Sequence, residues 1–561
     1  MKIKNCLIGL KKSIFNFFSI LYFKINKVVI FFFKKKKQDF HGGIDFLFMK
    51  KNIKTLPEKI ILPGDQFVVY LNFYTFEKVQ LRVQIGDYVF KGQLLVEGNK
   101  HIVPIHAPTS GKIIDIKRYL YDLILNKYRI DFFLIADGKD ISTKLFPIHH
   151  YKKIKRENII KLIYKNGIVG LGGAQFSTTR KLRIALHNNI DTLIINSLES
   201  EPYITADRWL MENYISDVLK GCEIIQWILR VKNVIIAIAD DQDDFFIKIK
   251  KEVLNYPGFK LRFIKQKYPS GSSKQLIKIL TGKEIPHNGH ATNLGIVMYN
   301  VGTVYAVKKA IIEGEPLISR VVTITGKALT YSGNMWVRFG VSISDLLIHL
   351  NYFNLKNKLV IIGGPLMGSV ISNIQTPVLK STNCILIPSD DEIKKKELEQ
   401  SCIRCGKCSN GCPMKLLPQQ LYWYSKGLNH DKTKEYKIKD CIECGICEQV
   451  CPSNIPLLNY FKKEKRILKE IEIFKIKSKE AKDRFQKKQF RLNSKKIISK
   501  KNIFFDSAAN SKKNDAFENI FKEDLIKKSI LKKEQEARKK SILDAIERVK
   551  NKKNGLRLNI K

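Results

Sequence analysis

The sequence predicts a multidomain α/β protein. Its 561 residues exceed the usual size of one domain and leave room for three or four. Between about 151 and 317, apolar runs typical of buried strands alternate with helical stretches, which favours a sheet layered with helices. A cysteine run at 402–452 is written twice in succession and indicates a further small domain built around thiol groups.

Residues 40–150 predict a β domain. Turn sequences at Gly86-Asp87 and Lys91-Gly92 separate short apolar segments, and the stretch 106–112 closes the set. Turns at such spacing are typical of a compact β sandwich. The pattern resembles a barrel-sandwich (biotinyl/lipoyl-like) fold, for which a scaffold role is the expectation.

A glycine cluster that suits a phosphate group ends the first predicted strand of the α/β region. It consists of Gly170, Gly172 and Gly173, and it is followed by Phe176 and Lys181. Bare amides at a helix start, with a lysine one or two turns later, form a phosphate cradle. The cluster is not a G-x-G-x-x-G sequence, so on its own it is weak evidence for a dinucleotide. Close packing of a helix on a strand is the alternative.

Polar side chains follow the next predicted strand, 191–196. Asn196 ends that strand and Glu199 comes shortly after it. The carboxyl ends of parallel strands are where α/β sheets bind ligands, so these side chains predict a cleft. Two later stretches, 268–275 and the helix start at Asn300, suit the same cleft; ordinary turns are the alternative.

The doubled cysteine run predicts two [4Fe-4S] clusters. In each copy, three cysteines at Cys-x-x-Cys-x-x-Cys spacing suit one cluster, and a fourth, followed by proline, reaches the other cluster. The first cluster would take Cys402, Cys405, Cys408 and Cys451, and the second would take Cys441, Cys444, Cys447 and Cys412.

Two other uses of these cysteines are weaker. A tetrathiolate zinc site would leave four thiols unexplained. Disulfide frameworks belong to small secreted domains, whereas this chain is long and rich in lysine. The remaining Cys6, Cys222 and Cys384 are scattered and are expected to be ordinary reduced thiols.

The formal net charge is +47, which suits nucleic acid or an anionic membrane surface. The lysines are spread through a chain that is also rich in Ile, Asn and Phe, so compositional drift explains the charge better, and no nucleic-acid partner is expected. Residues 1–39 alternate apolar patches with lysines. Their longest apolar run falls short of the roughly 20 residues that span a bilayer, so a position at the membrane interface or a disordered leader is expected.

The order of these motifs resembles the C subunit of the Rnf/Rsx electron-transport complex. The resemblance covers about 40–490 and includes the sequence Phe-His-Gly-Gly-Ile at 40–44, the stretches 106–111, 170–181, 194–207, 268–325 and 363–368, and the doubled cysteine run. Within that family, the α/β region is similar to the flavin-bearing, NADH-oxidising subunit of respiratory complex I.

The resemblance implies an FMN and NADH site. It implies that Gly170, Gly172, Gly173 and Lys181 hold the FMN phosphate, that Asn196 and Asn300 lie near the flavin, and that Phe176 and Glu199 approach NADH. The sequence departs from the pattern at Ser177, where a proline is usual, and at Ser197-Leu198, which replaces a small pair and puts Leu198 where complex I carries an acid.

The family implies a peripheral subunit on the cytoplasmic side of the inner membrane, which works with other subunits of a membrane complex. Electrons would pass between NADH and a low-potential, ferredoxin-like carrier through FMN and two clusters, coupled to ion translocation elsewhere in the complex. The alternatives are the flavin subunit of another NADH dehydrogenase, a cluster-bearing nucleic-acid protein, and an iron–sulfur scaffold without nucleotide oxidation. Complex I carries one cluster at this point and the sodium-pumping NADH:quinone reductase lacks the doubled run, so the cysteines disfavour both.

The predicted domains follow one another along the chain. They are a basic apolar segment (1–39), a barrel-sandwich-like β domain (40–150), a Rossmann-like FMN/NADH domain (151–317), a β-grasp-like domain with strands near 321–324, 337–339 and 360–364 (318–392), a two-cluster ferredoxin-like domain (393–460), and a Lys-rich tail that runs from helical to disordered (461–561), with disorder expected beyond about Asn493.

Overall fold

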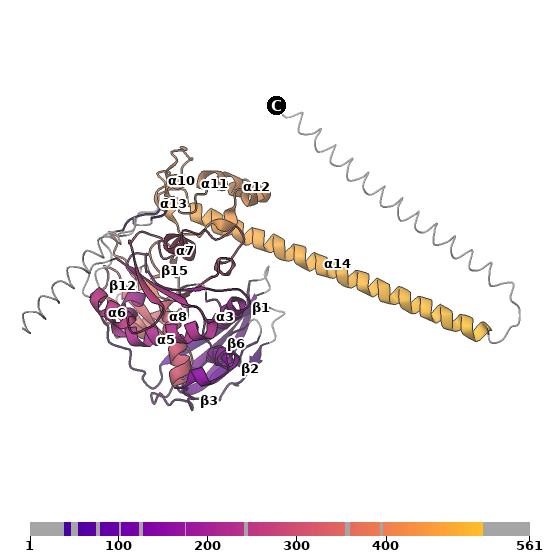
Figure 1. Ribbon diagram of the computed structural model, residues 1–561, viewed down its shortest axis with the longest axis horizontal. Helices are drawn as coiled ribbons and strands as arrows, with labels where there is room; N and C mark the ends of the chain where they lie inside the picture. The colour runs from indigo at the N-terminus through magenta and orange to yellow at the C-terminus, as the bar shows by residue number, and fades with distance from the viewer. Residues whose placement is uncertain are drawn as a thin grey trace, which may run out of the picture. The chain divides into compact units, whose positions relative to one another are not determined.

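The computed structural model describes residues 39–46, 54–74, 79–99, 102–122, 127–173, 175–240, 245–353, 359–392 and 397–508 (Figure 1). The expectations for residues 1–38, including Cys6, and for residues 509–561 lie outside these ranges. The chain forms two compact units that divide after Glu470. Within the described ranges, no helix combines the length and the apolar character needed to cross a bilayer.

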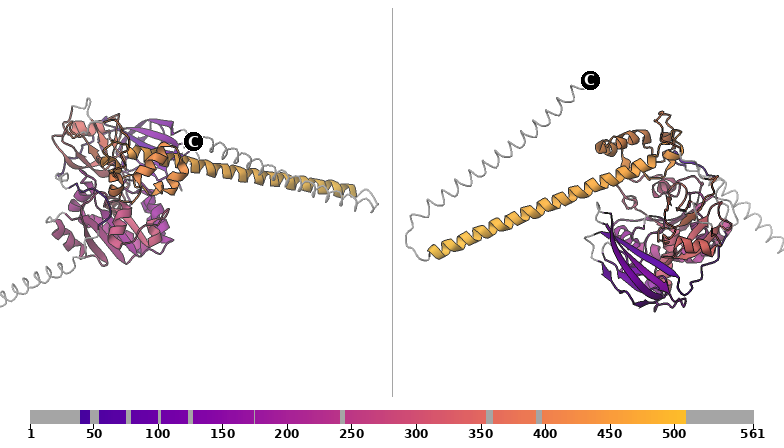
Figure 2. Two further views of the ribbon diagram at one scale, coloured as in Figure 1. Left: turned by 90° about the horizontal axis from the view of Figure 1, so that it is seen from above. Right: turned by 180° about the vertical axis from the view of Figure 1, so that it is seen from behind.

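Two antiparallel sheets form the N-terminal β domain, whose long strands are visible in Figure 2. Alternate residues of the first strand, among them Phe67, Val69 and Leu71, are buried, as the two-residue period of a strand requires. Both sheets contribute to one core. The first sheet comprises β1 (Gln66–Tyr74), β7 (Lys127–Ala136), β6 (Gly111–Asp122) and β3 (Tyr88–Val89), and the second β2 (Gln80–Leu81), β4 (Leu94–Glu97) and β5 (Ile105–His106).

A parallel sheet follows, with helices packed on both faces. Its order is β10 (Phe259–Ile264), β9 (Asn233–Ala239), β8 (Thr192–Ser197) and β11 (Ile296–Asn300). Neighbouring residues of β8 enter different cores: Leu193 packs with one group of helices, and Ile194 packs with another. The helices are α2 (Arg156–Lys165), α3 (Thr178–Leu186), α4 (Ala206–Asn213), α5 (Ile215–Leu229), α6 (Phe245–Val253), α7 (Ser273–Thr281) and α8 (Val301–Lys308), with short helices η1 (Tyr151–Lys153), η2 (Ala291–Leu294) and η3 (Lys309–Glu313).

A mixed five-stranded sheet comes next in the chain. Its order is β13 (Gly333–Arg338), β12 (Ser319–Thr325), β16 (Cys384–Leu386), β14 (Ile361–Ile362) and β15 (Ser369–Val370), and α9 (Ile343–His349) joins β13 to the later strands. Val322 and Ile324 of β12 share the core of the N-terminal β domain, so the two regions are packed together.

The cysteine region consists of short helices. They are α10 (Lys407–Gly411), α11 (Pro418–Lys426), α12 (His430–Glu435), η4 (Ile438–Asp440) and α13 (Ile446–Gln449), and the long helix α14 (Leu457–Ala508) follows them. Phe461 and Leu468, in the first turns of α14, are buried in the same core as Cys412 and Cys447. The beginning of α14 is therefore part of this region (Figure 1).

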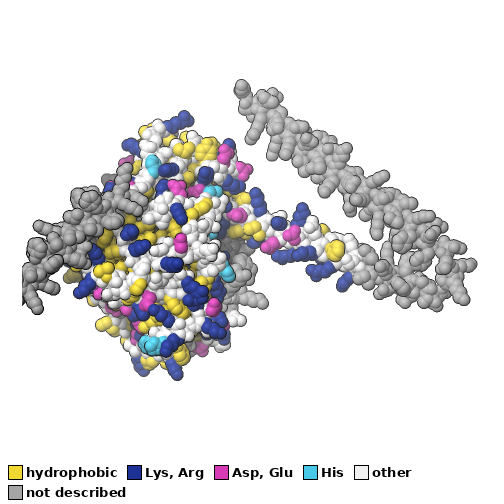
Figure 3. Space-filling model, viewed as in Figure 1, with side chains coloured by type: hydrophobic (Ala, Val, Ile, Leu, Met, Phe, Trp, Pro, Cys, Tyr) yellow, Lys and Arg dark blue, Asp and Glu magenta, His cyan; other side chains and the backbone are white. Residues whose placement is uncertain are grey.

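Several predicted elements occur and two differ. The strands expected at 191–196, 234–239 and 321–324 are β8, β9 and β12. The strand expected before Gly170 is wrong, because Val169 makes only a single bridge to Ser177 there. Helix α14 continues to Ala508, beyond the expected end of order near Asn493. Lys and Arg side chains are interspersed with acidic and apolar ones on the face shown in Figure 3.

Candidate redox site

The structure gathers the eight cysteines of the doubled run into two groups of four. One hollow is lined by Cys402, Cys405, Cys408 and Cys451. A second is lined by Cys412, Cys441, Cys444 and Cys447. We call these the outer and the inner hollow. In each hollow the fourth cysteine comes from the other copy of the run, which is the exchange that the spacing predicts.

The backbone takes the same course in both copies of the run. Arg404 and Glu443, at matching positions, have positive φ angles of 55° and 56°. Gly406 and Gly445 follow at 77° and 74° and precede α10 and α13. Glycine adopts this left-handed conformation without strain, so it allows the chain to turn tightly between two cysteines.

The two hollows differ in burial. Cys412, Cys444 and Cys447 of the inner hollow are buried, whereas Cys405 of the outer hollow is exposed. Backbone amides point at inner sulfurs: Leu416 N lies 3.4 Å from Cys412 Sγ. Burial raises the pKa of the Cys444 thiol to about 12, so a free thiol there keeps its proton and metal binding must displace it.

The donor set fits iron–sulfur clusters. Four sulfurs surround each hollow, and apolar side chains, including Leu421 and Phe461 at the inner one, complete its walls. Among the described residues, no three His, Cys, Asp or Glu side chains lie close enough together to hold a single metal ion. The sulfurs instead stand around a space between them.

The glycine cluster lies against the end of the parallel sheet. A Cβ placed on Gly172 would lie 3.2 Å from Cβ of Asn300, so the loop and the end of β11 are in contact. Gly173 has a φ of +114°, and a Cβ there would meet no atom within 4 Å. The loop thus presents bare backbone to open space at this position, as a phosphate cradle requires.

Lys181 supplies a cation beside this loop. Its amine donates a hydrogen bond to Met298 O and lies 4.6 Å from the ring centre of Tyr299. Burial of the amine lowers its pKa to about 8. Within the described residues it forms no ion pair, so its charge is available to an anion such as the FMN phosphate.

The two predicted asparagines meet at the carboxyl end of the sheet. Asn196 and Asn300 are register partners in the parallel pair β8 and β11. Asn196 Nδ2 donates to Gly271 O at 2.9 Å, and Asn300 Oδ1 accepts from Gly302 N at 2.9 Å and so caps α8. The amide of Asn300 also donates to Asp207, a residue that the sequence did not single out.

Phe176 and Glu199 flank this arrangement. The ring of Phe176 is exposed and lies 5.6 Å from the guanidinium of Arg180. The carboxylate of Glu199 accepts from Asp207 N at 2.8 Å, at the first turn of α4. An exposed aromatic ring beside the cradle can pack against a planar ring, while Glu199 is held in place by the helix start.

The segment 268–275 connects the cradle with the inner hollow. At one end Gly271 O accepts from Asn196. At the other, the hydroxyl of the buried Tyr268 donates to Cys444 O at 2.7 Å, and Gln275 Nε2 donates to Pro413 O at 3.0 Å. Sequence reasoning noted this segment as part of the cleft, but it missed the contacts with the cysteines, because they form only in the folded chain.

Models of three protein families match separate parts of the chain. They are the RnfC barrel sandwich hybrid domain at residues 38–127, the Nuo51 FMN-binding domain at 163–309 and the 4Fe-4S dicluster domain at 401–455. These matches confirm the barrel-sandwich, FMN-binding and two-cluster regions expected from the sequence. The chain therefore carries an FMN-binding domain and a 4Fe-4S dicluster domain.

Solved structures resemble the chain weakly. The NAD+-reducing [NiFe]-hydrogenase in the H2-reduced state is 15% identical, with a TM-score of 0.41, over 57% of this chain and 63% of that one. The same enzyme in the air-oxidized state is 17% identical, with a TM-score of 0.39, over 55% of this chain and 60% of that one.

Curated relatives are far more similar, and each is named as the C subunit of an ion-translocating oxidoreductase complex. The protein of Erwinia tasmaniensis is 43% identical over 83% of this chain, which spans 58% of that relative's length. For Buchnera aphidicola subsp. Baizongia pistaciae the identity is 44%, over 82% of this chain and 90% of the relative. For Buchnera aphidicola subsp. Acyrthosiphon pisum it is 43%, over 87% of this chain and 99% of the relative. The chain belongs to this family, the C subunits of ion-translocating oxidoreductase complexes.

Proposed function

We propose that this chain is the electron-carrying peripheral subunit of a membrane complex that couples electron transfer between NADH and a low-potential, ferredoxin-like carrier to ion translocation. The complex lies in the inner membrane, and this subunit lies on the membrane surface at the cytoplasmic side. The names of the relatives and the FMN-binding and dicluster matches support this function. The other subunits of the complex carry the ion path.

Each predicted residue has a role in this proposal. The amides of Gly170, Gly172 and Gly173 and the ammonium of Lys181 hold the FMN phosphate. Asn196 and Asn300 position the flavin, and Phe176 and Glu199 receive NADH. When bound, FMN supplies the exchange between two-electron hydride chemistry and one-electron transfer. The mixed sheet at 318–392 is β-grasp-like, and the parallel sheet at 151–317 is Rossmann-like.

The observation that carries the proposal is the short connection between the two candidate sites. Tyr268 and Gly271 lie three residues apart, and one contacts Cys444 while the other contacts Asn196. A cluster in the inner hollow is therefore the neighbour of the flavin site. The outer hollow, with its exposed Cys405, is the exit toward a partner protein.

This order predicts different results for two matched substitutions. Cys405→Ala removes the outer cluster and leaves an inner cluster that NADH still reduces. Cys444→Ala removes the inner cluster and leaves an outer cluster that NADH no longer reduces at a comparable rate. Anaerobic EPR after rapid mixing with NADH measures both. If the outer cluster is reduced equally fast without the inner one, the proposed order is wrong.

A further inference from the structure

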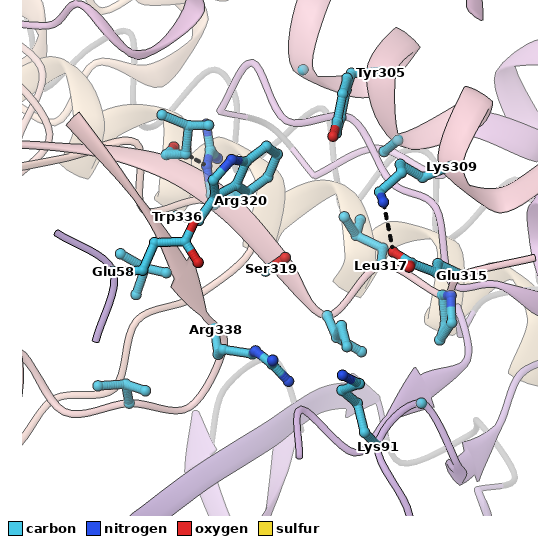
Figure 4. Close-up of a pocket in the computed structure, with 18 of the residues that line it drawn as sticks. Glu58, Lys91, Tyr305, Lys309, Glu315, Leu317, Ser319, Arg320, Trp336 and Arg338 are labelled. Carbon is cyan, nitrogen blue, oxygen red and sulfur yellow. Dashed lines mark hydrogen bonds and ion pairs between the residues drawn. The ribbon is translucent and has the colours of Figure 1, made fainter. Parts of the chain in front are cut away.

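A cavity of about 680 Å³ lies apart from the cysteines and the glycine cradle (Figure 4). Three parts of the chain enclose it: loops of the N-terminal β domain, helices α4 and α8, and strands β12 and β13. It comes closest to the cradle at Asp207 and Gly302, which contact Asn300 from the other side. Its size falls within the range of small-molecule sites.

A buried guanidinium forms part of the cavity wall. Arg320 is 4% exposed; its Nε donates to Val321 O at 3.3 Å and its Nη1 donates to Lys380 O at 2.6 Å. Within the described residues its Nη2 has no hydrogen-bond partner, and no carboxylate forms an ion pair with it. Desolvation lowers the pKa of Arg320 to about 10. A buried cation without a contacting anion is costly, and a bound anion would offset that cost.

A buried tyrosine hydroxyl points into the same space. Tyr305 is 7% exposed, and Figure 4 shows its hydroxyl directed into the cavity. Within the described ranges this hydroxyl has no hydrogen-bond partner. The ring packs against Trp336 and Tyr214, at centroid distances of 5.3 and 5.4 Å. The cavity thus has an aromatic wall with a free donor on it.

The opposite wall carries an excess of positive charge. Lys91 Nζ and the guanidinium of Arg338 both contact the carboxylate of Asp140, at 2.8 and 2.7 Å. Two cations therefore share one anion. Lys309 is paired with Glu315 at 3.1 Å, and the exposed Glu58 also lines the cavity. Figure 4 shows the side chains of Lys91 and Arg338 directed toward the same space.

We propose that this cavity binds a small aromatic anion of the nucleoside monophosphate class, at a site separate from the FMN and NADH cleft. Arg320 receives the phosphate, because a guanidinium matches phosphate oxygens with paired donors. The base packs against the aromatic wall, and the hydroxyl of Tyr305 donates a hydrogen bond to it. The site rests on the cavity and its unpaired groups, so it stands independently of the proposed electron transfer.

The test measures AMP binding to the full chain, with FMN and clusters in place, by equilibrium dialysis. Adenosine and inorganic phosphate each supply half of the recognised chemistry and should bind at least about tenfold more weakly than AMP. Arg320→Gln should weaken AMP binding by about tenfold or more, and Tyr305→Phe should weaken it by a factor of about 2 to 10. Tyr305→Phe removes one oxygen and no packing, so it decides the matter if Arg320→Gln does not fold.

Two controls complete the experiment. Tyr299→Phe removes another buried hydroxyl without a partner, which lies outside the cavity lining, and should leave AMP binding unchanged. Phe176→Ala alters the proposed NADH cleft and should also leave it unchanged. The proposal is overturned if millimolar AMP does not bind, if Tyr305→Phe binds AMP as the wild type does, or if Phe176→Ala abolishes the binding.

Discussion

Lys181 is a partly buried cation whose only described hydrogen bond is to a backbone carbonyl. We expect Lys181→Ala to weaken FMN binding by about tenfold or more, because a charged hydrogen bond to phosphate is lost, and to leave both clusters in place. Flavin fluorescence of the denatured extract and iron and sulfide analysis measure the two contents. Arg183→Ala, on the same helix but exposed, is the matched control. Full flavin occupancy in Lys181→Ala would contradict the phosphate assignment.

The lowered pKa of Lys181 also gives FMN binding a pH dependence. Without ligand the amine loses its proton as the pH rises through about 8, whereas bound phosphate favours the charged form. FMN affinity should therefore be full below pH 8 and should fall above it, by up to about tenfold per pH unit. Measurement of the FMN dissociation constant from pH 7 to 9.5 tests this. In Lys181→Arg the fall should vanish, since a guanidinium stays protonated.

Asn300 combines two roles that substitutions can separate. Asn300→Ala removes the cap of α8 and should lower the free energy of unfolding by about 1 kcal/mol. Asn300→Ser keeps a capping oxygen, so its stability should change by only a few tenths of a kcal/mol. Both variants lose the hydrogen bond to Asp207 and should bind FMN more weakly. Urea unfolding and FMN titration measure the two effects, and an equal stability loss in both would argue against the cap.

Individual residues of the site were predictable where their type and spacing restrict the chemistry. The partners of the cysteines follow from spacing alone, because the fourth thiolate of each copy cannot reach the cluster that its three neighbours hold. Asn196 and Asn300 were predictable as polar residues at a strand end and a helix start. Asp207 and Arg320 were not, since each occurs in an ordinary sequence context and acquires its role by tertiary contact.

Among the elements, the buried strands were the most predictable. β8, β9 and β12 consist of apolar, mostly β-branched runs that few other structures accommodate. The run before Gly170 misled the prediction, because a short apolar segment fits a strand and a helix-to-loop transition equally well. Helix α14 extends further than expected. Local pairs such as Arg466–Glu470 and Glu480–Arg484 support it without a wide apolar face.

Across the whole molecule, the sequence could not predict which parts meet. Tyr268 and Cys444 are far apart in the chain, and no local pattern announces their hydrogen bond. The cavity at Tyr305 and Arg320 likewise forms only when three regions pack together. These contacts give the molecule its electron path and its additional site, so they are the features for which the structure was needed.

The central claim is that electrons from NADH reach the two clusters only through FMN. The most direct test adds NADH anaerobically to the wild-type chain and to Lys181→Ala with its clusters intact, and follows cluster reduction by EPR and by the loss of visible absorbance. We expect reduction of both clusters in the wild type and none in the flavin-free variant, with recovery when excess FMN is added. Reduction of the clusters by NADH without FMN, or no reduction when FMN and clusters are both present, would contradict the claim.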